Sequence, residues 1–263
     1  MQYTNDLVPG GRLSILEVGP PKTGKTLFAA SFPEPYFAST DNRMMPVKTF
    51  KPLEGKKIAF DYFTEYPKLI KRFEELDRHC PYGTVVLDNL TFSGELAISY
   101  ATGLSGQGGK SEKGRSKGVI ALPTIEDWMG ETEAIKDILN ILVTLPCHII
   151  MIAHIMVRQT NNIKTGESFV EQTLVSGAKR TASIVTGYFD EVYQFDKEIT
   201  IEGKDKFTFR TSGRGAATAL PLRSIYDFTG MNAFDMLTGD LGDQSAVLEQ
   251  LKKEAAGRVR LGG

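Results

Sequence analysis

The stretch that decides the fold reads Gly19-Pro20-Pro21-Lys22-Thr23-Gly24-Lys25-Thr26. It matches the phosphate-binding (Walker A) loop pattern, whose glycines let successive backbone N–H groups point at phosphate oxygens. An apolar run, Leu13 to Val18, precedes it, and an amphipathic stretch follows, which is the strand, loop and helix context that the pattern requires. We expect Lys25 to reach the β- and γ-phosphates of a nucleotide and Thr26 to hold Mg²⁺ through its hydroxyl group.

Outward from this loop, short apolar runs alternate with longer amphipathic stretches, as in a parallel sheet flanked by helices. Strands are predicted at Leu13–Val18, Pro35–Ser39, Lys57–Tyr62, Thr84–Asp88, His148–Ala153 and Glu191–Phe195. Helices are predicted at Lys25–Phe32, Glu65–His79, Phe92–Thr102 and Ile125–Leu145. Near the C-terminal end, Glu198–Glu202 and Lys206–Thr211 flank a Gly203-Lys204-Asp205 turn and predict an antiparallel hairpin. The fold class is therefore α/β, a mostly parallel sheet flanked by helices with a C-terminal hairpin.

The length of 263 residues suits one α/β domain with insertions. We assign residues 1–240 to this domain and residues 241–263 to a C-terminal helix and tail. The 31 basic and 32 acidic residues nearly balance, so a polyanionic partner must meet a local cationic patch. The apolar runs are too short to span a bilayer, and no membrane association is expected. A polar N-terminal stretch and only two cysteines, Cys80 and Cys147, predict a cytoplasmic protein with reduced, structural thiols.

Polar side chains stand at the ends of three predicted strands. Asp88 ends the run Thr84–Asp88, which predicts a carboxylate beside the phosphate loop that holds Mg²⁺ through its water shell. Asp41 follows the Pro35–Ser39 strand and is a candidate catalytic carboxylate, although it could instead cap a turn with Asn42. His154 follows the His148–Ala153 strand, as a sensor of the terminal phosphate would, or as an ordinary surface histidine would.

Three segments carry cations that could contact DNA or a neighbouring subunit's nucleotide. Residues 103–118 are rich in glycine and lysine and predict a mobile basic loop, which could track DNA phosphates or form a flap over the nucleotide. A second polar stretch, Gln159–Ser168, is also predicted to be a loop. The candidate phosphate contacts are Lys110, Lys113, Arg115, Lys117, Lys179, Arg180 and Arg214. For the last three, solvated surface cations are the alternative.

Taken together, the phosphate loop, Asp41, Asp88 and His154 resemble a RecA-like P-loop ATPase core over about residues 11–215. The size is most similar to that of phage-encoded RecA-like nucleotide-binding proteins, which include single-strand annealing proteins of phage recombination. The resemblance implies an ATP- and Mg²⁺-dependent, DNA-stimulated ATPase that binds single-stranded DNA and promotes annealing or strand pairing. It also implies a homo-oligomeric ring or filament, a single-strand binding protein as a further partner, and the cytoplasm of a bacterial host.

The same resemblance suggests roles for individual residues. In RecA-like ATPases a glutamate at the position of Asp41 polarises the attacking water, and a polar residue at the position of His154 links nucleotide state to the DNA-binding loop. In AAA+ ATPases a glutamate usually follows the metal-binding aspartate, whereas Asn89 follows Asp88 here. We therefore expect the general base to be Asp41.

Two other functions are compatible with these residues. A replication helicase-like motor or helicase loader would use the same ATP site but would also translocate. A nucleotide-gated oligomeric scaffold would bind ATP with little turnover, and the shorter Asp41 in place of a glutamate is compatible with this alternative.

Overall fold

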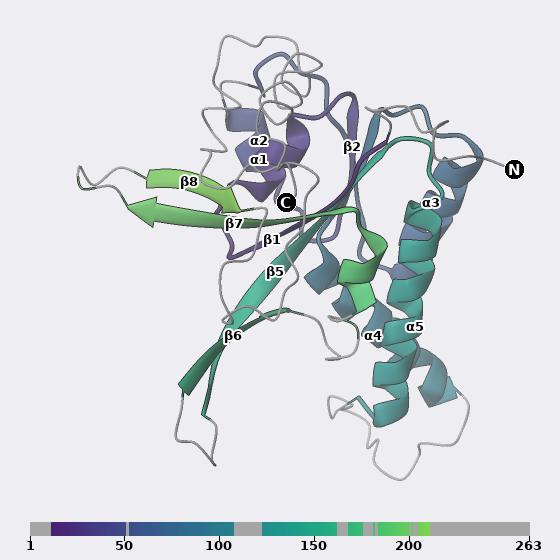
Figure 1. Cartoon of the computed structure of the whole chain (residues 1–263). Helices are drawn as coiled ribbons and strands as arrows, with labels where there is room; N and C mark the ends of the chain where they lie inside the picture. The colour runs from purple at the N-terminus through teal and green to yellow at the C-terminus, as the bar shows by residue number, and fades with distance from the viewer. Residues whose placement is uncertain are drawn as a thin grey trace, which may run out of the picture.

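A computed structural model describes residues 12–50, 53–107, 123–161, 168–175, 181, 184–199, 201 and 205–210. Its centre is a twisted sheet with helices on both faces (Figure 1). Among the helices in these ranges, none has both the length and the apolar composition needed to cross a membrane. The predictions for Lys110–Lys117, Lys179, Arg180, Arg214, the C-terminal helix and tail at 241–263 and the boundary at residue 240 lie outside the described residues.

Six strands form the parallel part of the sheet, in the order β3-β2-β4-β5-β1-β7. They are β1 (Ser14–Gly19), β2 (Pro35–Ser39), β3 (Ala59–Tyr62), β4 (Thr84–Asp88), β5 (His148–Asn161) and β7 (Glu191–Ile199). Two further strands pair antiparallel: β8 (Asp205–Arg210) with β7, and β6 (Ser168–Leu174) with the distal half of β5. The predicted α/β class and hairpin are thus confirmed.

The helices cover the two faces of the sheet. They are α1 (Lys25–Ala30), α2 (Met45–Thr49), α3 (Tyr66–Arg78), α4 (Leu90–Gln107) and α5 (Ile125–Leu142), with a short 3₁₀ helix at Thr186–Tyr188. Buried residues of α3, α4 and α5 form one core with one face of the sheet, whereas α1 and α2 cover the other face. The layers therefore enclose the central strands on both sides, as a parallel sheet requires.

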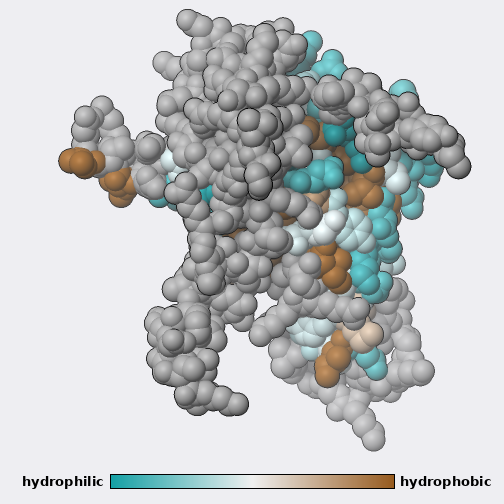
Figure 2. Space-filling model, viewed as in Figure 1, coloured by the Kyte–Doolittle hydropathy of each residue, from teal (hydrophilic) through white to brown (hydrophobic). Residues whose placement is uncertain are grey.

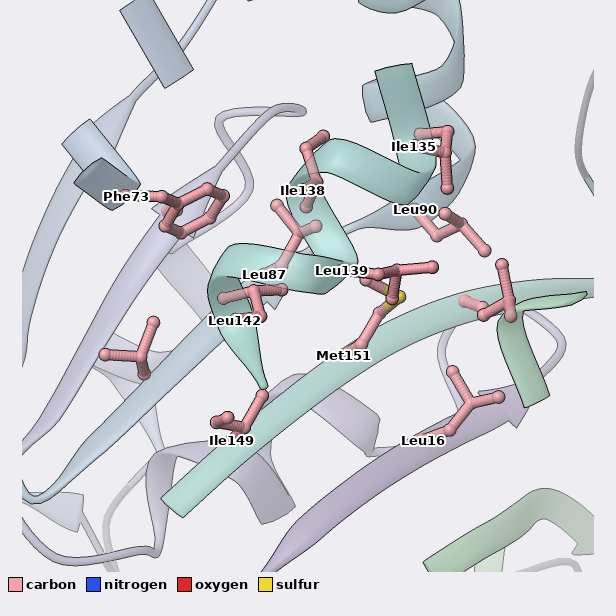
Figure 3. Packing of buried hydrophobic residues seen from close by; sticks show 14 of the residues in the cluster. Leu16, Phe73, Leu87, Leu90, Ile135, Ile138, Leu139, Leu142, Ile149 and Met151 are labelled. Atoms are coloured by element: carbon pink, nitrogen blue, oxygen red, sulfur yellow. The ribbon is translucent and has the colours of Figure 1, made fainter. Parts of the chain in front are cut away.

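Helix α5 shows how the sequence builds the larger core. It begins with a capping box, in which Thr124 and Asp127 each accept a hydrogen bond from the other's backbone N–H group. Its buried residues recur with helical spacing and pack on the sheet (Figure 3). They include Ile135, Ile138, Leu139 and Leu142, which lie close to Leu87 of β4 and Met151 of β5 in this view.

Several boundaries differ from the prediction. Strand β5 continues to Asn161 and β6 begins at Ser168, so the predicted loop Gln159–Ser168 is strand at both ends. Residues 155–161 and 168–174 form a β5–β6 arm whose two strands, within the described residues, pair only with each other, so its polar residues give no apolar alternation to detect. Likewise, α4 extends to Gln107, which places residues 103–107 in a helix instead of the basic loop.

The C-terminal hairpin also differs in detail. The predicted strands Glu191–Phe195 and Glu198–Glu202 are one strand, β7, which ends at Ile199. Figure 2 shows hydrophobic residues at the outer end of this hairpin, where Ile199 and Ile201 are exposed. Because these apolar residues are exposed, the apolar pattern of the sequence does not mark where β7 ends.

A core substitution tests this packing. Leu139→Ala is expected to lower the free energy of unfolding by about 2 to 5 kcal/mol, because it removes a fully buried side chain. Met129→Ala on the same helix is the matched control: Met129 is 63% exposed, and the change should stay within about 0.5 kcal/mol. Urea unfolding monitored by circular dichroism measures both, and equal effects would contradict the assigned core.

Candidate functional site

The parallel register brings the predicted site residues to one edge of the sheet. Gly19 pairs with His154 across β1 and β5, and Ser39 pairs with Asp88 across β2 and β4. Because β5 lies between β1 and β4, the phosphate loop, Asp88 and His154 meet at the carboxyl ends of neighbouring strands. Open α/β sheets bind their ligands at this edge.

The phosphate loop requires glycine at both of its ends. Gly19 has a φ of 155° and Gly24 a φ of 91°, and a Cβ atom on Gly19 would lie 2.3 Å from the carbonyl oxygen of Phe195. Gly24 is the N-cap of α1, and no side chain caps this helix. The first backbone N–H groups of α1 can therefore donate hydrogen bonds to an anion, and a phosphate group suits this position.

Lys25 lies buried inside the loop. Its Nζ donates hydrogen bonds to the carbonyl oxygens of Gly19, at 2.9 Å, and of Pro20, at 2.6 Å. Burial lowers the pKa of Lys25 to about 8, although Glu17 and Asp88 act in the opposite direction. The loop thus holds a cation next to its own N–H groups, as phosphate binding requires.

Thr26 and Asp88 provide oxygen ligands suited to Mg²⁺. The Thr26 hydroxyl donates to Oδ2 of Asp88 at 3.0 Å, which joins the start of α1 to the tip of β4. Burial and the nearby Asp41 raise the pKa of Asp88 to about 7, so a bound cation would favour its charged form. Within the described residues there is no group of three or more His, Cys, Asp or Glu that could hold a metal. A Mg²⁺ ion bound to Thr26 and Asp88 would also take oxygen ligands from phosphate and water.

Asp41 is held in a turn at the tip of β2. Its Oδ1 accepts from the backbone N–H of Arg43 at 3.2 Å, and its Oδ2 accepts from Nδ2 of Asn89 at 3.4 Å. The Arg43 guanidinium lies 3.9 Å from Oδ2. The turn bond that the sequence left as an alternative is therefore present, yet the carboxylate also lines the cavity.

His154 stands across the cavity edge from Asp41. Its Nε2 lies 3.4 Å from Nδ2 of Asn89, so one amide lies between the histidine and the aspartate. Burial, assisted by the positive charge of Lys25, lowers the pKa of His154. Both effects favour the neutral imidazole.

These groups line a cavity of about 350 Å³, a size that suits a small molecule. The lining residues are Pro21, Lys22, Thr23, Gly24, Lys25, Thr26, Leu27, Asp41, Arg43, Pro46, Asp88, Ile152 and His154. The predicted loop, acids and histidine thus lie together.

Two members of the site were missed by sequence reasoning. The sequence identified Asn89 only as the residue that stands where AAA+ ATPases have a glutamate. Its position directly after Asp88 could have indicated that its amide lies between Asp41 and His154. Arg43 lines the cavity because the turn after β2, with Asn42 at a φ of 54°, brings it back towards the phosphate loop. No apolar periodicity marks such a turn.

A family model described as an AAA domain matches residues 12–218, which include every element of the site. The chain belongs to this AAA domain family. It is a P-loop ATPase, as its phosphate loop and parallel sheet also indicate. Comparison with curated proteins gave no match.

The AAA domain also buries a carboxyl group directly beneath its phosphate loop. Glu17 of β1 is fully buried, and neither of its carboxyl oxygens has a hydrogen-bond partner among the described residues. Burial raises the pKa of Glu17 well above its ordinary value of 4.5, while Lys25 lowers it and Asp88 raises it further. Glu17 does not line the cavity and is distinct from the residues that can touch a nucleotide.

Removing the loop cation tests the site. Lys25→Ala should abolish ATP binding in calorimetry, because the loop loses the charge that neutralises the phosphates. The far-UV circular dichroism spectrum should stay unchanged. Lys71→Ala, at an exposed lysine of α3, is the control and should bind normally. An unaltered ATP affinity in Lys25→Ala would place the nucleotide elsewhere.

The buried Glu17 should make the free energy of unfolding depend on pH. The folded chain keeps a proton on Glu17 that the unfolded chain loses above pH 4.5, so this residue lowers stability as pH rises towards its folded pKa. Glu17→Gln should therefore gain stability relative to the native chain, by at most about 1.4 kcal/mol for each pH unit in that window. Urea unfolding between pH 5 and pH 8 measures it, with Glu74→Gln on the exposed side of α3 as control. A pH-independent difference would contradict the assigned protonation.

Proposed function

We propose that this ATPase binds single-stranded DNA under the control of ATP and Mg²⁺ and promotes annealing or strand pairing, as in phage recombination. The observation that carries the proposal is the continuity of β5. This one strand passes from the central sheet through His154 in the cavity to Asn161 in the β5–β6 arm (Figure 1). A movement of His154 when a nucleotide binds could therefore be transmitted along β5 to the β5–β6 arm, which lies outside the ATP site.

The end of β6 returns to the same place. The backbone N–H of Val175 donates to the carbonyl oxygen of His154 at 2.8 Å. The carbonyl oxygen of Val175 accepts from the Thr91 hydroxyl, in the first turn of α4, at 3.0 Å. Helix α4 begins at Leu90, directly after the Asp88 and Asn89 pair. The end of the arm is thus hydrogen-bonded both to β5 and to the first turn of α4, the helix that follows β4.

A second anchor follows in the chain. The Thr181 hydroxyl lies 2.9 Å from the Thr132 hydroxyl and donates to Oε2 of Glu131 at 3.3 Å, both on α5. Residues 176–180, which include Lys179 and Arg180, therefore lie in sequence between Val175, which is hydrogen-bonded to His154, and Thr181, which is hydrogen-bonded to α5. This placement supports a role for these two cations in contacts with phosphates of DNA, or with a neighbouring subunit's nucleotide in a homo-oligomer.

The basic segment has a similar attachment. Residues 108–118 follow α4, whose first turn is joined to Val175. Their lysines and arginine could track a DNA backbone by charge alone, which the near-neutral net charge of the whole chain could not do. Both cationic segments thus adjoin in sequence Val175 or α4, which are hydrogen-bonded to each other through Thr91, and this supports DNA as the ligand that ATP controls.

The hydrolysis chemistry follows from the cavity. The loop N–H groups and Lys25 bind the phosphates, and Thr26 and Asp88 hold the cation. A Mg²⁺ ion held by these residues would supply positive charge to the phosphate oxygens. Asp41 is the one lining carboxylate of the described residues besides Asp88, and it accepts the proton of the attacking water. Asn89 orients Asp41, because its amide lies between the carboxylate of Asp41 and the imidazole of His154.

The experiment is Mg²⁺-ATP hydrolysis with and without single-stranded DNA. We expect DNA to raise the rate of the native chain and Lys25→Ala to be inactive. Asp41→Asn should keep ATP binding but lose about 100-fold or more in rate, because a general base is worth that much. Lys179→Ser with Arg180→Ser should keep the basal rate and lose the stimulation. Serine at Lys110, Lys113, Arg115 and Lys117 should weaken DNA binding and flatten its salt dependence.

The outcomes separate the alternatives. A DNA-stimulated rate with strand annealing and no unwinding supports the proposal. Directional unwinding of a tailed duplex would instead identify a helicase-like motor, and ATP-dependent loading of a helicase would identify a loader. A low rate indifferent to DNA, with oligomers that form only when ATP is present, would identify a nucleotide-gated scaffold. We also predict that the protein forms a homo-oligomeric ring or filament and that it binds a single-strand binding protein, and the same protein preparations can be used to test both.

A further inference from the structure

The two cysteines of the chain lie in contact. Sγ of Cys80 is 3.6 Å from Sγ of Cys147, although 67 positions separate them in sequence. Cys80 lies between α3 and β4, and Cys147 directly precedes β5. The two strands are neighbours, and Thr84 pairs with His148 next to the thiols. The sequence alone predicted two separate structural thiols, because nothing in it indicates that these segments meet.

We propose that Cys80 and Cys147 form a reversible disulfide, a redox modification site at the sheet edge opposite the ATP cavity. A disulfide needs its sulfur atoms about 2.05 Å apart, so closure requires a shift of roughly 1.5 Å. Both cysteines lie just outside regular elements, where such a shift can be shared without breaking the strand pairing. The oxidant is a small-molecule disulfide of the glutathione class.

The difference in burial sets the order of the two steps. Cys147 is buried, and burial raises its pKa to about 12, with a further rise from the neighbouring Cys80 and an opposing effect of Arg12. Cys80 is partly exposed and reacts first. Its thiolate attacks one sulfur of the small disulfide, forms a mixed disulfide and releases one thiolate. Capping also removes the contribution of Cys80 to the pKa of Cys147.

The second step closes the bridge. Cys147 gives its proton to solvent and attacks the Cys80 sulfur, which releases the second small-molecule thiol. In total, two protein thiols are oxidised and one small disulfide is reduced to two thiols. The bridge would fasten the first ends of β4 and β5, whose other ends carry Asp88 and His154. It should therefore stabilise the sheet without covering the cavity.

The test equilibrates the full-length chain with mixtures of reduced and oxidised glutathione. Acid quenching, alkylation under denaturing conditions, intact mass and peptide mapping follow. We expect the native chain to lose both thiols together, with a peptide that links Cys80 to Cys147 and no bound glutathione. Its thermal midpoint should rise by about 5 °C or more on oxidation and return with a reductant.

Single variants provide the controls. Cys147→Ser should stop at a mixed disulfide on Cys80, and Cys80→Ser should leave Cys147 reduced. Neither should show the thermal shift. Glutathione retained on Cys80 of the native chain, disulfide-linked dimers, or two free thiols in the most oxidising mixture would each overturn the proposal. A matching spectrum for Cys80→Ser and the reduced native chain verifies that the variant folds.

Discussion

The register of four neighbouring parallel strands is the constraint on which the rest of the structure depends. It sets Gly19 beside His154 and Ser39 beside Asp88, so that the phosphate loop, Asp88 and His154 share one edge although they come from distant parts of the sequence. A shift of one residue in any pair would turn alternate side chains to the opposite face and would separate Thr26 from Asp88. Burial on both faces of the sheet maintains this register, because a slip of one central strand would displace side chains that are packed on both sides.

Much of this arrangement could be predicted from the sequence, and the failures have physical causes. The phosphate loop and the central strands are marked by glycine spacing and by short apolar runs, which depend on local geometry and on burial. The distal part of β5 and the strand β6 were missed because they pair with each other outside the core, where burial imposes no pattern. Arg43 and Asn89 were missed because their roles depend on a turn and on an amide placed between Asp41 and His154. The contact of Cys80 with Cys147 follows from strand order, which no local pattern indicates.

The charges around the phosphate loop explain why the site is suited to respond to a nucleotide. Lys25, Asp88 and Glu17 are all buried and lie close enough to alter one another's pKa values. A phosphate would stabilise the charged form of Lys25, and a cation would stabilise the charged form of Asp88. Binding of both would therefore favour the charged forms of Lys25 and Asp88 together. Asn89 lies next to His154, whose carbonyl oxygen accepts a hydrogen bond from Val175 at the end of β6, so hydrogen bonds connect the cavity to the arm.

Amide hydrogen exchange with and without Mg²⁺-ATP tests most directly whether the cavity is coupled to the β5–β6 arm. We expect slower exchange in the phosphate loop and, at the same time, in residues 155–161 and 168–175, above all at the Val175 amide that donates to His154. The same measurement on Lys25→Ala should show neither change. Protection confined to the phosphate loop and α1, with unchanged exchange in the arm, would contradict this coupling.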